Sequence, residues 1–148
     1  MTNDPHRTAR VDDVAYVDFP HTHSEGIDMC AVCNNVSGIL PFAVRRVFYI
    51  LGVPEGDSRG AHSHFVERQV ILVLKGEFNV EVCDGSERRV FHVDSPSRGL
   101  YVPPGLWRRI HDFSADAVCL VLSSTDYDES DYVRDFDRFL YLTSLSNE

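Results

Sequence analysis

GDSRGAHSHFVERQVILVLKG, residues 56–76, is the stretch that decides the fold of this chain. It places His62 and His64 two residues apart and follows them with the apolar run of residues 69–74. Residues two apart on a strand point to the same face, so we expect both imidazoles on one side of a strand. The continuous apolar run is typical of a strand that is buried on both faces.

Short strands separated by turn residues are predicted on either side of this stretch. Residues 78–83 alternate between apolar and polar side chains, which is the two-residue period of a strand with one buried face. Asp84-Gly85 is a strong hairpin signal, and residues 88–93 return antiparallel. Further strands are expected at residues 45–51, 100–102, 107–111 and 117–123. This spacing favours a sandwich or barrel.

The tail of the chain changes to a helical period. Tyr132, Phe136, Phe139 and Leu140 lie on one face of a helix, and Ser130 is a suitable N-cap. We therefore expect an all-β fold with one short C-terminal helix, in which residues 1–10 form a loosely attached arm and residues 11–148 a single domain.

Composition limits the possible functions. The 148 residues carry a formal net charge of -9, which argues against a broad nucleic-acid surface. Lys75 is the only lysine, so the positive charge is almost all arginine, which suits bidentate contact with a diphosphate. No apolar run is long enough to cross a bilayer, and no signal peptide is evident, so no membrane partner and a cytoplasmic location are expected. Cys30 and Cys33 form a lone C-x-x-C, which we interpret as reduced cysteines rather than half of a zinc site.

The histidine stretch resembles the first motif of the cupins, which are double-stranded β-helix or jelly-roll barrels. In metal-binding cupins a glutamate ligand lies at the position of Gln69, and a last histidine ligand at the position of Arg108 in the second motif. An amide is a poor ligand, and a guanidinium opposes a divalent ion. We therefore expect a single cupin domain without a metal or other cofactor, in which the imidazoles are left free for acid–base work.

At family level the chain resembles the dTDP-4-keto-6-deoxyglucose 3,4-ketoisomerases, which move a ketone from C4 to C3 of a nucleotide-linked sugar. The segments that carry the resemblance are residues 41–42, 45–50, 59–64, 69–70, 94–96, 99–102, 107, 111–114 and 127–132. The resemblance implies an isomerase of deoxysugar biosynthesis, a dTDP-linked 4-keto-6-deoxysugar as substrate, and a homodimer. The chain departs from the family pattern at Arg108, where a histidine is expected, and at Glu25, where an arginine is common.

Moving a ketone to the neighbouring carbon requires a base, an enediol and an acid. We assign proton transfer to His62 and His64, in either order, and name Tyr49, with Arg59 and Gln69, as candidate donors to the enediolate oxygen. Several further residues are candidates for binding the substrate, and each also fits an ordinary structural role. They are Arg46 and Arg59 for the diphosphate, Gln69, Arg108 and, stacking on thymine or packing in the core, Trp107.

Other functions remain open. A 3,5-epimerase-like cupin shares the metal-free barrel and a proton-abstracting histidine, and a non-catalytic sugar-nucleotide-binding cupin needs no proton transfer at all. The acidic residues from Asp126 to Asp131 are interpreted as a lead-in to the helix, and His21 and His23 as part of a loop.

Overall fold

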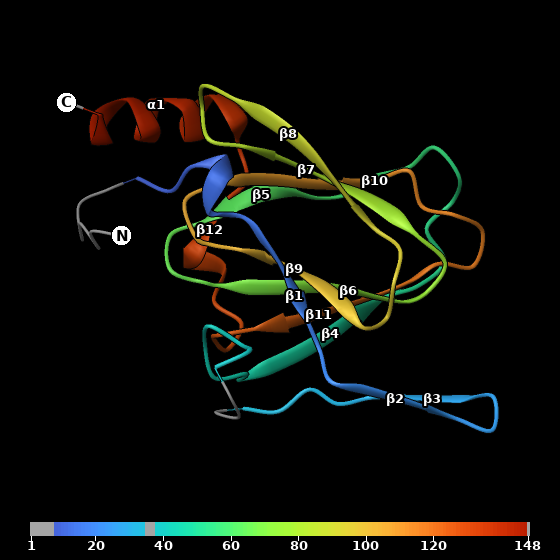
Figure 1. The fold of residues 1–148 in the computed structure, drawn as a ribbon. Helices are drawn as coiled ribbons and strands as arrows, with labels where there is room; N and C mark the ends of the chain where they lie inside the picture. Colours follow the sequence, from blue (N-terminus) through green and yellow to red (C-terminus); the bar gives the residue numbers. More distant parts are fainter. Residues whose placement is uncertain (1–7, 35–37, 148) are drawn as a thin grey trace.

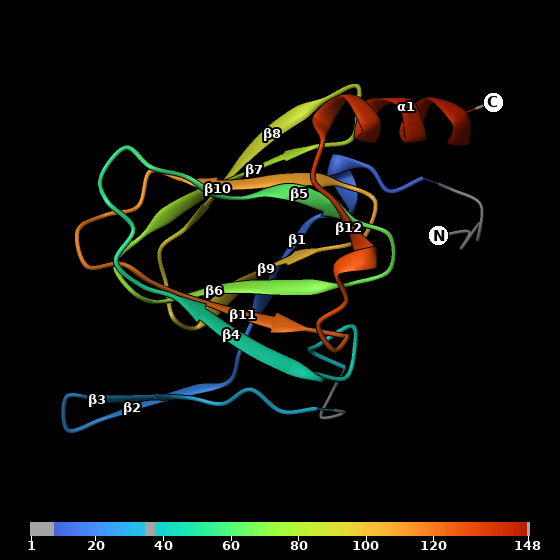
Figure 2. The same cartoon turned by 180° about the vertical axis from the view of Figure 1, so that it is seen from behind.

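Two five-stranded antiparallel sheets face each other and enclose the core of the protein (Figures 1 and 2). In this computed structural model, residues 8–34 and 38–147 are described, so most of the expected N-terminal arm lies outside the described residues. The first sheet has the order β1-β9-β6-β11-β4 and the second the order β12-β5-β10-β7-β8, while β2 and β3 form a separate hairpin. The expected all-β jelly-roll architecture with a C-terminal helix is confirmed.

The strands follow the predicted turn chemistry closely. Their bounds are β1 Ala15–Asp18, β2 His21–Ser24, β3 Ile27–Cys30, β4 Arg46–Ile50, β5 Arg59–His64, β6 Gln69–Lys75, β7 Phe78–Cys83, β8 Arg88–Val93, β9 Arg98–Val102, β10 Trp107–His111, β11 Val118–Ser123 and β12 Tyr132–Val133. Short 3-10 turns lie at Val11–Asp13 and Glu129–Asp131, and the helix α1 spans Phe136–Ser146. The turn after β6 depends on Gly76, whose φ is +76° and whose Cβ, if present, would lie 2.3 Å from the Ser114 hydroxyl.

β6 is buried on both faces, as its unbroken apolar run predicts. Ile71 and Val73 belong to the core between the two sheets. Val70 and Leu72 lie on the outer face of the first sheet, where Phe19 and the segment around Phe42 cover them. A third apolar cluster joins the outer face of the second sheet to α1.

Two local expectations are wrong. The helix starts at Phe136 rather than near Ser130, because Tyr132 pairs with His64 as part of β12 and is therefore extended. Its N-cap is Asp135, whose side chain accepts a hydrogen bond from the Arg138 amide. The segment containing His21 is not a loop but strand β2, paired with β3.

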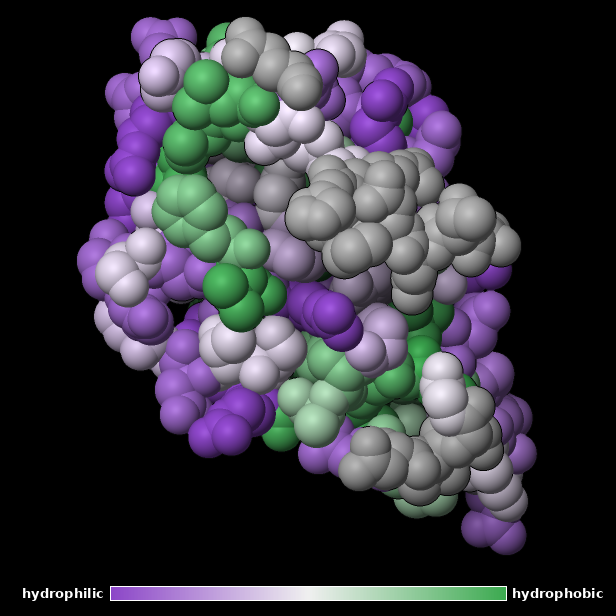
Figure 3. Space-filling model, turned by 90° about the vertical axis from the view of Figure 1, so that its left-hand side faces the viewer, coloured by the Kyte–Doolittle hydropathy of each residue, from purple (hydrophilic) through white to green (hydrophobic). Residues whose placement is uncertain are grey.

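The first described residues and the end of α1 lie at the end of the barrel where β12 joins β5, where the Thr8 hydroxyl donates to Asn147 Oδ1 at 3.2 Å (Figure 1). Viewed from that end, a band of hydrophobic surface runs between hydrophilic margins (Figure 3).

All four cysteines are free. Among the described residues, no helix is long and apolar enough to span a membrane.

Candidate active site

The two histidines of β5 lie side by side inside the barrel. His62 is paired with Arg108 on β10, and His64 with Tyr132 on β12. The centroids of the two imidazole rings are 4.7 Å apart, and the Tyr132 ring lies 4.9 Å from His62 and 4.4 Å from His64. Ser63, between them, points to the opposite face and lines a pocket with residues of α1. The structure thus brings the predicted pair together.

A register shift at the start of β5 turns Arg59 toward the same side. Between β10 and β5, Arg108 pairs with His62 and Ile110 with Arg59, so three steps on β5 match two on β10. Gly60, within this irregularity, has a φ of +71°, which suits glycine. Directly paired residues of antiparallel strands share a face, so Arg59 follows the face of His62. Its guanidinium is exposed and donates to the Ser58 carbonyl oxygen at 2.8 Å.

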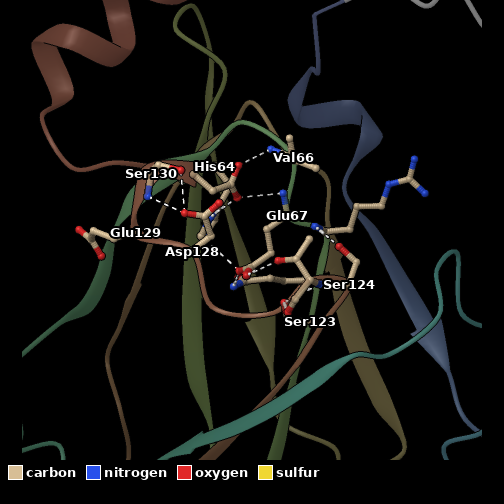
Figure 4. Close-up of polar contacts among 12 residues, drawn as sticks. His64, Val66, Glu67, Ser123, Ser124, Asp128, Glu129 and Ser130 are labelled. Atoms are coloured by element: carbon tan, nitrogen blue, oxygen red, sulfur yellow. Dashed lines mark hydrogen bonds and ion pairs between the residues drawn. The ribbon is translucent and has the colours of Figure 1, made fainter.

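His64 is fully buried between two carboxylates (Figure 4). Its Nδ1 lies 3.1 Å from Asp131 Oδ2. Its Nε2 lies 3.2 Å from Glu67 Oε2, but without hydrogen-bond geometry, so this nitrogen is buried without a hydrogen-bond partner. An ionised carboxylate only accepts, so the proton of a neutral His64 ring lies on Nδ1.

Glu67 connects the remaining polar side chains of the barrel interior. It is 1% exposed, and its Oε1 accepts from Arg46 at 2.7 Å and from the Thr125 hydroxyl at 3.1 Å. Its Oε2 accepts from the Gln69 amide, whose oxygen in turn accepts from Arg108 at 2.8 Å. Arg46 and Gln69 are therefore engaged within the protein.

Burial, followed by the positive charge of Arg108, is the main cause of the altered pKa values of the histidines. It lowers the pKa of His62 to about 3 and that of His64 to about 2. Burial also lowers the pKa of Arg108 to about 10. At neutral pH both imidazoles are uncharged and able to accept a proton, while the arginine remains cationic.

Arg108 is fully buried at the centre of this group. Besides Gln69 it donates to the Pro103 carbonyl oxygen at 3.3 Å, and its Nε has no hydrogen-bond partner. A buried donor without a partner carries a free-energy cost, which a substrate oxygen would remove. Arg108 is thus better placed than the fully engaged Gln69 to donate to an anionic oxygen.

Two predicted site residues lie elsewhere. Tyr49 is 66% exposed on the outer face of β4, whereas Arg46 and Phe48 occupy the inner face. Trp107 packs against Phe136 and Phe139 of α1 on the outer face of the second sheet, with ring centroids 5.2 and 5.8 Å away. Tyr49 therefore does not lie beside the histidines of its own chain, and Trp107 has the core role that the sequence also allowed.

Three residues of this group were missed by the sequence analysis. Glu67 lies within the deciding stretch, and its place between His64 and Gln69 could have indicated it. Asp131 and Tyr132 lie within a family-like segment, but Asp131 was interpreted as part of a helix lead-in and Tyr132 as part of the helix. The positions at which metal-binding cupins have a carboxylate and a third histidine are occupied by Gln69 and Arg108, hydrogen-bonded to each other. In the described part of the chain, no three His, Cys, Asp or Glu side chains form a group able to hold a metal ion.

Comparison with known proteins agrees with this arrangement. The family model FdtA, described as WxcM-like, C-terminal, matches residues 12–144. A TDP-4-oxo-6-deoxy-alpha-D-glucose-3,4-oxoisomerase of Aneurinibacillus thermoaerophilus is 43% identical over 110 residues, which cover 74% of this chain and 79% of that protein.

Solved structures give the same result. QdtA, a sugar 3,4-ketoisomerase from Thermoanaerobacterium thermosaccharolyticum in complex with TDP, superposes with a TM-score of 0.87 at 31% identity, covering 92% of this chain and 98% of that one. A histidine-to-asparagine variant of QdtA, in complex with TDP-4-keto-6-deoxyglucose, superposes with a TM-score of 0.87 at 30% identity, covering 92% and 97% of the two chains.

Proposed function

We propose that this chain, which belongs to the FdtA family (described as WxcM-like, C-terminal), is a 3,4-ketoisomerase of a dTDP-linked 4-keto-6-deoxyhexose. The observation that carries the proposal is the pair of uncharged imidazoles, 4.7 Å apart on one face of β5. Two proton-transfer groups at this separation suit a reaction at two adjacent carbons. The bound ligands of QdtA support the class of substrate.

The reaction conserves atoms and electrons. One imidazole takes the proton from C3, and the C–H electron pair becomes the C3–C4 double bond of an enediol as the C4 oxygen is protonated. A proton is then delivered to C4 while the C3 hydroxyl loses its own, which leaves the ketone at C3. His62 is the less buried of the two rings, and Arg108 Nε is a candidate donor to the transient oxyanion. No redox cofactor enters this balance.

Arg59 is the proposed ligand of the diphosphate. It follows the face of His62 and is exposed, and among the described residues its guanidinium donates only to the neighbouring Ser58 backbone oxygen. Arg46, the other candidate, holds Glu67 and is only 18% exposed. A bidentate contact with phosphate oxygens is therefore easier to form at Arg59.

Incubation of the protein with dTDP-4-keto-6-deoxyglucose, followed by NMR, tests the proposal. We expect the ketone to move to C3, and deuterium from solvent to appear at C3 or C4. Label at C3 and C5 without ketone migration would indicate an epimerase instead. Tight binding without any turnover would indicate a non-catalytic sugar-nucleotide-binding cupin. Either result would overturn the assignment.

We further propose a homodimer in which the β2–β3 hairpin contacts a second copy of the chain. Every residue of both strands is exposed, and the hairpin projects beneath the first sheet (Figures 1 and 2). One face of it carries Ile27 and Met29, which are 68% and 62% exposed. The outer face of the edge strand β4 exposes Val47 and Tyr49. Exposed apolar side chains on a protruding hairpin and on a sheet edge favour association.

Sedimentation of the wild type and of Ile27→Glu measures this association. We expect a dimer for the wild type and a shift toward the monomer for the variant, because a buried, unpaired carboxylate would be costly in the interface. Thr22→Glu, at a position paired with Met29 on the same hairpin face, should act in the same direction, whereas His21→Glu, paired with Cys30 on the opposite face, should not. A monomeric wild type would refute the proposal.

A further inference from the structure

The carboxylate of Asp131 makes three contacts around His64. Its Oδ1 accepts from the Val66 amide at 2.8 Å, and its Oδ2 accepts from the Glu67 amide at 3.1 Å and lies 3.1 Å from His64 Nδ1. The Asp131 backbone oxygen also accepts from the Phe65 amide at 3.1 Å. One residue of the C-terminal segment thus holds both the imidazole and the turn that follows it in sequence.

From these contacts we infer that Asp131 is a positioning residue for the proton-transfer pair, which fixes the His64 ring with Nδ1–H toward its carboxylate and Nε2 as the nitrogen that exchanges protons. The inference rests on the proposed function of the site. Asp131 itself does not touch the substrate in this scheme and acts through His64. Its side chain is 12% exposed, so the contact is largely shielded from water.

The chemistry of Asp131 and His64 determines which nitrogen of the imidazole carries the hydrogen. Since the carboxylate accepts and never donates when ionised, a neutral His64 ring must place its hydrogen on Nδ1. That leaves the lone pair on Nε2, which lies 3.2 Å from Glu67 Oε2 without hydrogen-bond geometry and has no hydrogen-bond partner among the described residues. When Nε2 gains a proton, the adjacent Asp131 carboxylate stabilises the imidazolium, as the triad aspartate does for its histidine in serine proteases.

Asp131 is held in place by its own segment. Asp128 caps the 3-10 turn Glu129–Asp131 by accepting from the amide and hydroxyl of Ser130, at 3.0 and 2.6 Å. Tyr132, the next residue, pairs with His64 as part of β12. Asp128 lies in the same turn and has the same charge, but no hydrogen bond or ion pair of the described residues joins it to His64, so it offers a matched control.

The test uses the full chain labelled with 15N-histidine, and the His64 signals are identified by their loss in His64→Asn. In the wild type we expect the long-range 15N–1H spectrum to show a protonated Nδ1 and an unprotonated Nε2. In Asp131→Asn the side-chain oxygen can still accept from a backbone amide, but its NH₂ can now face Nδ1, so the hydrogen should move to Nε2. We expect kcat to fall by about 10²- to 10⁴-fold with little change in KM, because a wrong tautomer removes the acceptor without removing the binding contacts.

Asp128→Asn keeps a side-chain oxygen that can accept from the Ser130 amide and so preserves the cap, and it should leave the His64 tautomer unchanged and kcat within about threefold of the wild type. A wild-type His64 with its hydrogen on Nε2, an unchanged tautomer in Asp131→Asn, or an equal fall in kcat for both variants would overturn the inference. The wild-type spectrum decides even if a variant fails to fold. A correct tautomer in a protein that does not convert the sugar would refute the proposed function and leave the positioning role intact.

Discussion

The two ends of the barrel interior are built from the same strands but have opposite chemistry. On β4, β6, β10 and β11 the inward positions at one end are Arg46, Gln69, Arg108 and Ser123, and further along the same strands they are Phe48, Ile71, Ile110 and Val121. The apolar end contributes buried area that stabilises the fold. The polar end must satisfy every buried charge through partners such as Glu67, because a buried charge without a partner is costly. The proposed site therefore lies at the end of the barrel whose inward side chains contribute less to the stability of the fold.

The largest expected effect is on catalysis at the polar end. His62→Asn should lower kcat by about 10²- to 10⁴-fold, the range for a lost general acid or base. The side chains are similar in size and the native imidazole is uncharged, so the midpoint of urea unfolding should change little. Ketone migration followed by NMR, together with urea unfolding, measures both quantities. A variant with near wild-type kcat would separate His62 from the chemistry.

Breaking one ion pair at the polar end should mainly reduce stability. Arg46→Ala leaves the buried Glu67 carboxylate without its cation and should lower the free energy of unfolding by about 3–5 kcal/mol. Arg45→Ala is the matched control, because Arg45 pairs with Asp126 at the surface, with side chains 62% and 75% exposed. Its cost should be at most about 1 kcal/mol by urea denaturation. Equal costs would show that the interior pair is no more important than an exposed one.

A substitution at the apolar end should lower stability and leave the catalytic rate almost unchanged. Ile71→Val removes one buried methylene and should lower the free energy of unfolding by about 0.5–1.5 kcal/mol. Since Ile71 belongs to the apolar core cluster and keeps its shape nearly unchanged as valine, kcat should remain within about twofold. Steady-state kinetics and urea unfolding on the same preparation make the comparison. A large fall in kcat would mean that the two ends are mechanically coupled.

The last comparison concerns the pH dependence of stability. The pKa of His62 is about 3 in the folded chain and has a reference value of 6.5, so below pH 6.5 the unfolded chain binds a proton that the folded chain excludes. Stability from this group is complete above pH 6.5 and is lost as the pH falls toward 3. Tm should decrease between pH 7 and about pH 5, and His62→Asn should decrease less. Identical pH slopes for the two proteins would contradict the depressed pKa.

Much of the site could be predicted from the alternation of side chains between the two faces of a strand. His62 and His64 share a face because they are two residues apart, and the alternation of residues 78–83 places their apolar side chains in the core. The same rule should have excluded Tyr49 from the face of Arg46, since the two residues are three positions apart on a regular strand and therefore point to opposite faces. The start of the helix was misjudged because Tyr132 fits the helical period, although its backbone bonds to β5 instead.

From the sequence alone came the strands β4 to β11, the turns between them and the shared face of the two imidazoles, because each depends on neighbours a few residues apart. Only the tertiary structure revealed which end of each inner face is polar, the carboxylate of Glu67 turned onto Arg46, and Asp131 against His64 from 67 positions away in the chain. The contact between Asp131 and His64 exists because β12 pairs with β5, and no pattern of neighbouring residues in the sequence predicts that pairing. The protonation and orientation of His64 therefore depend on a contact that only folding creates.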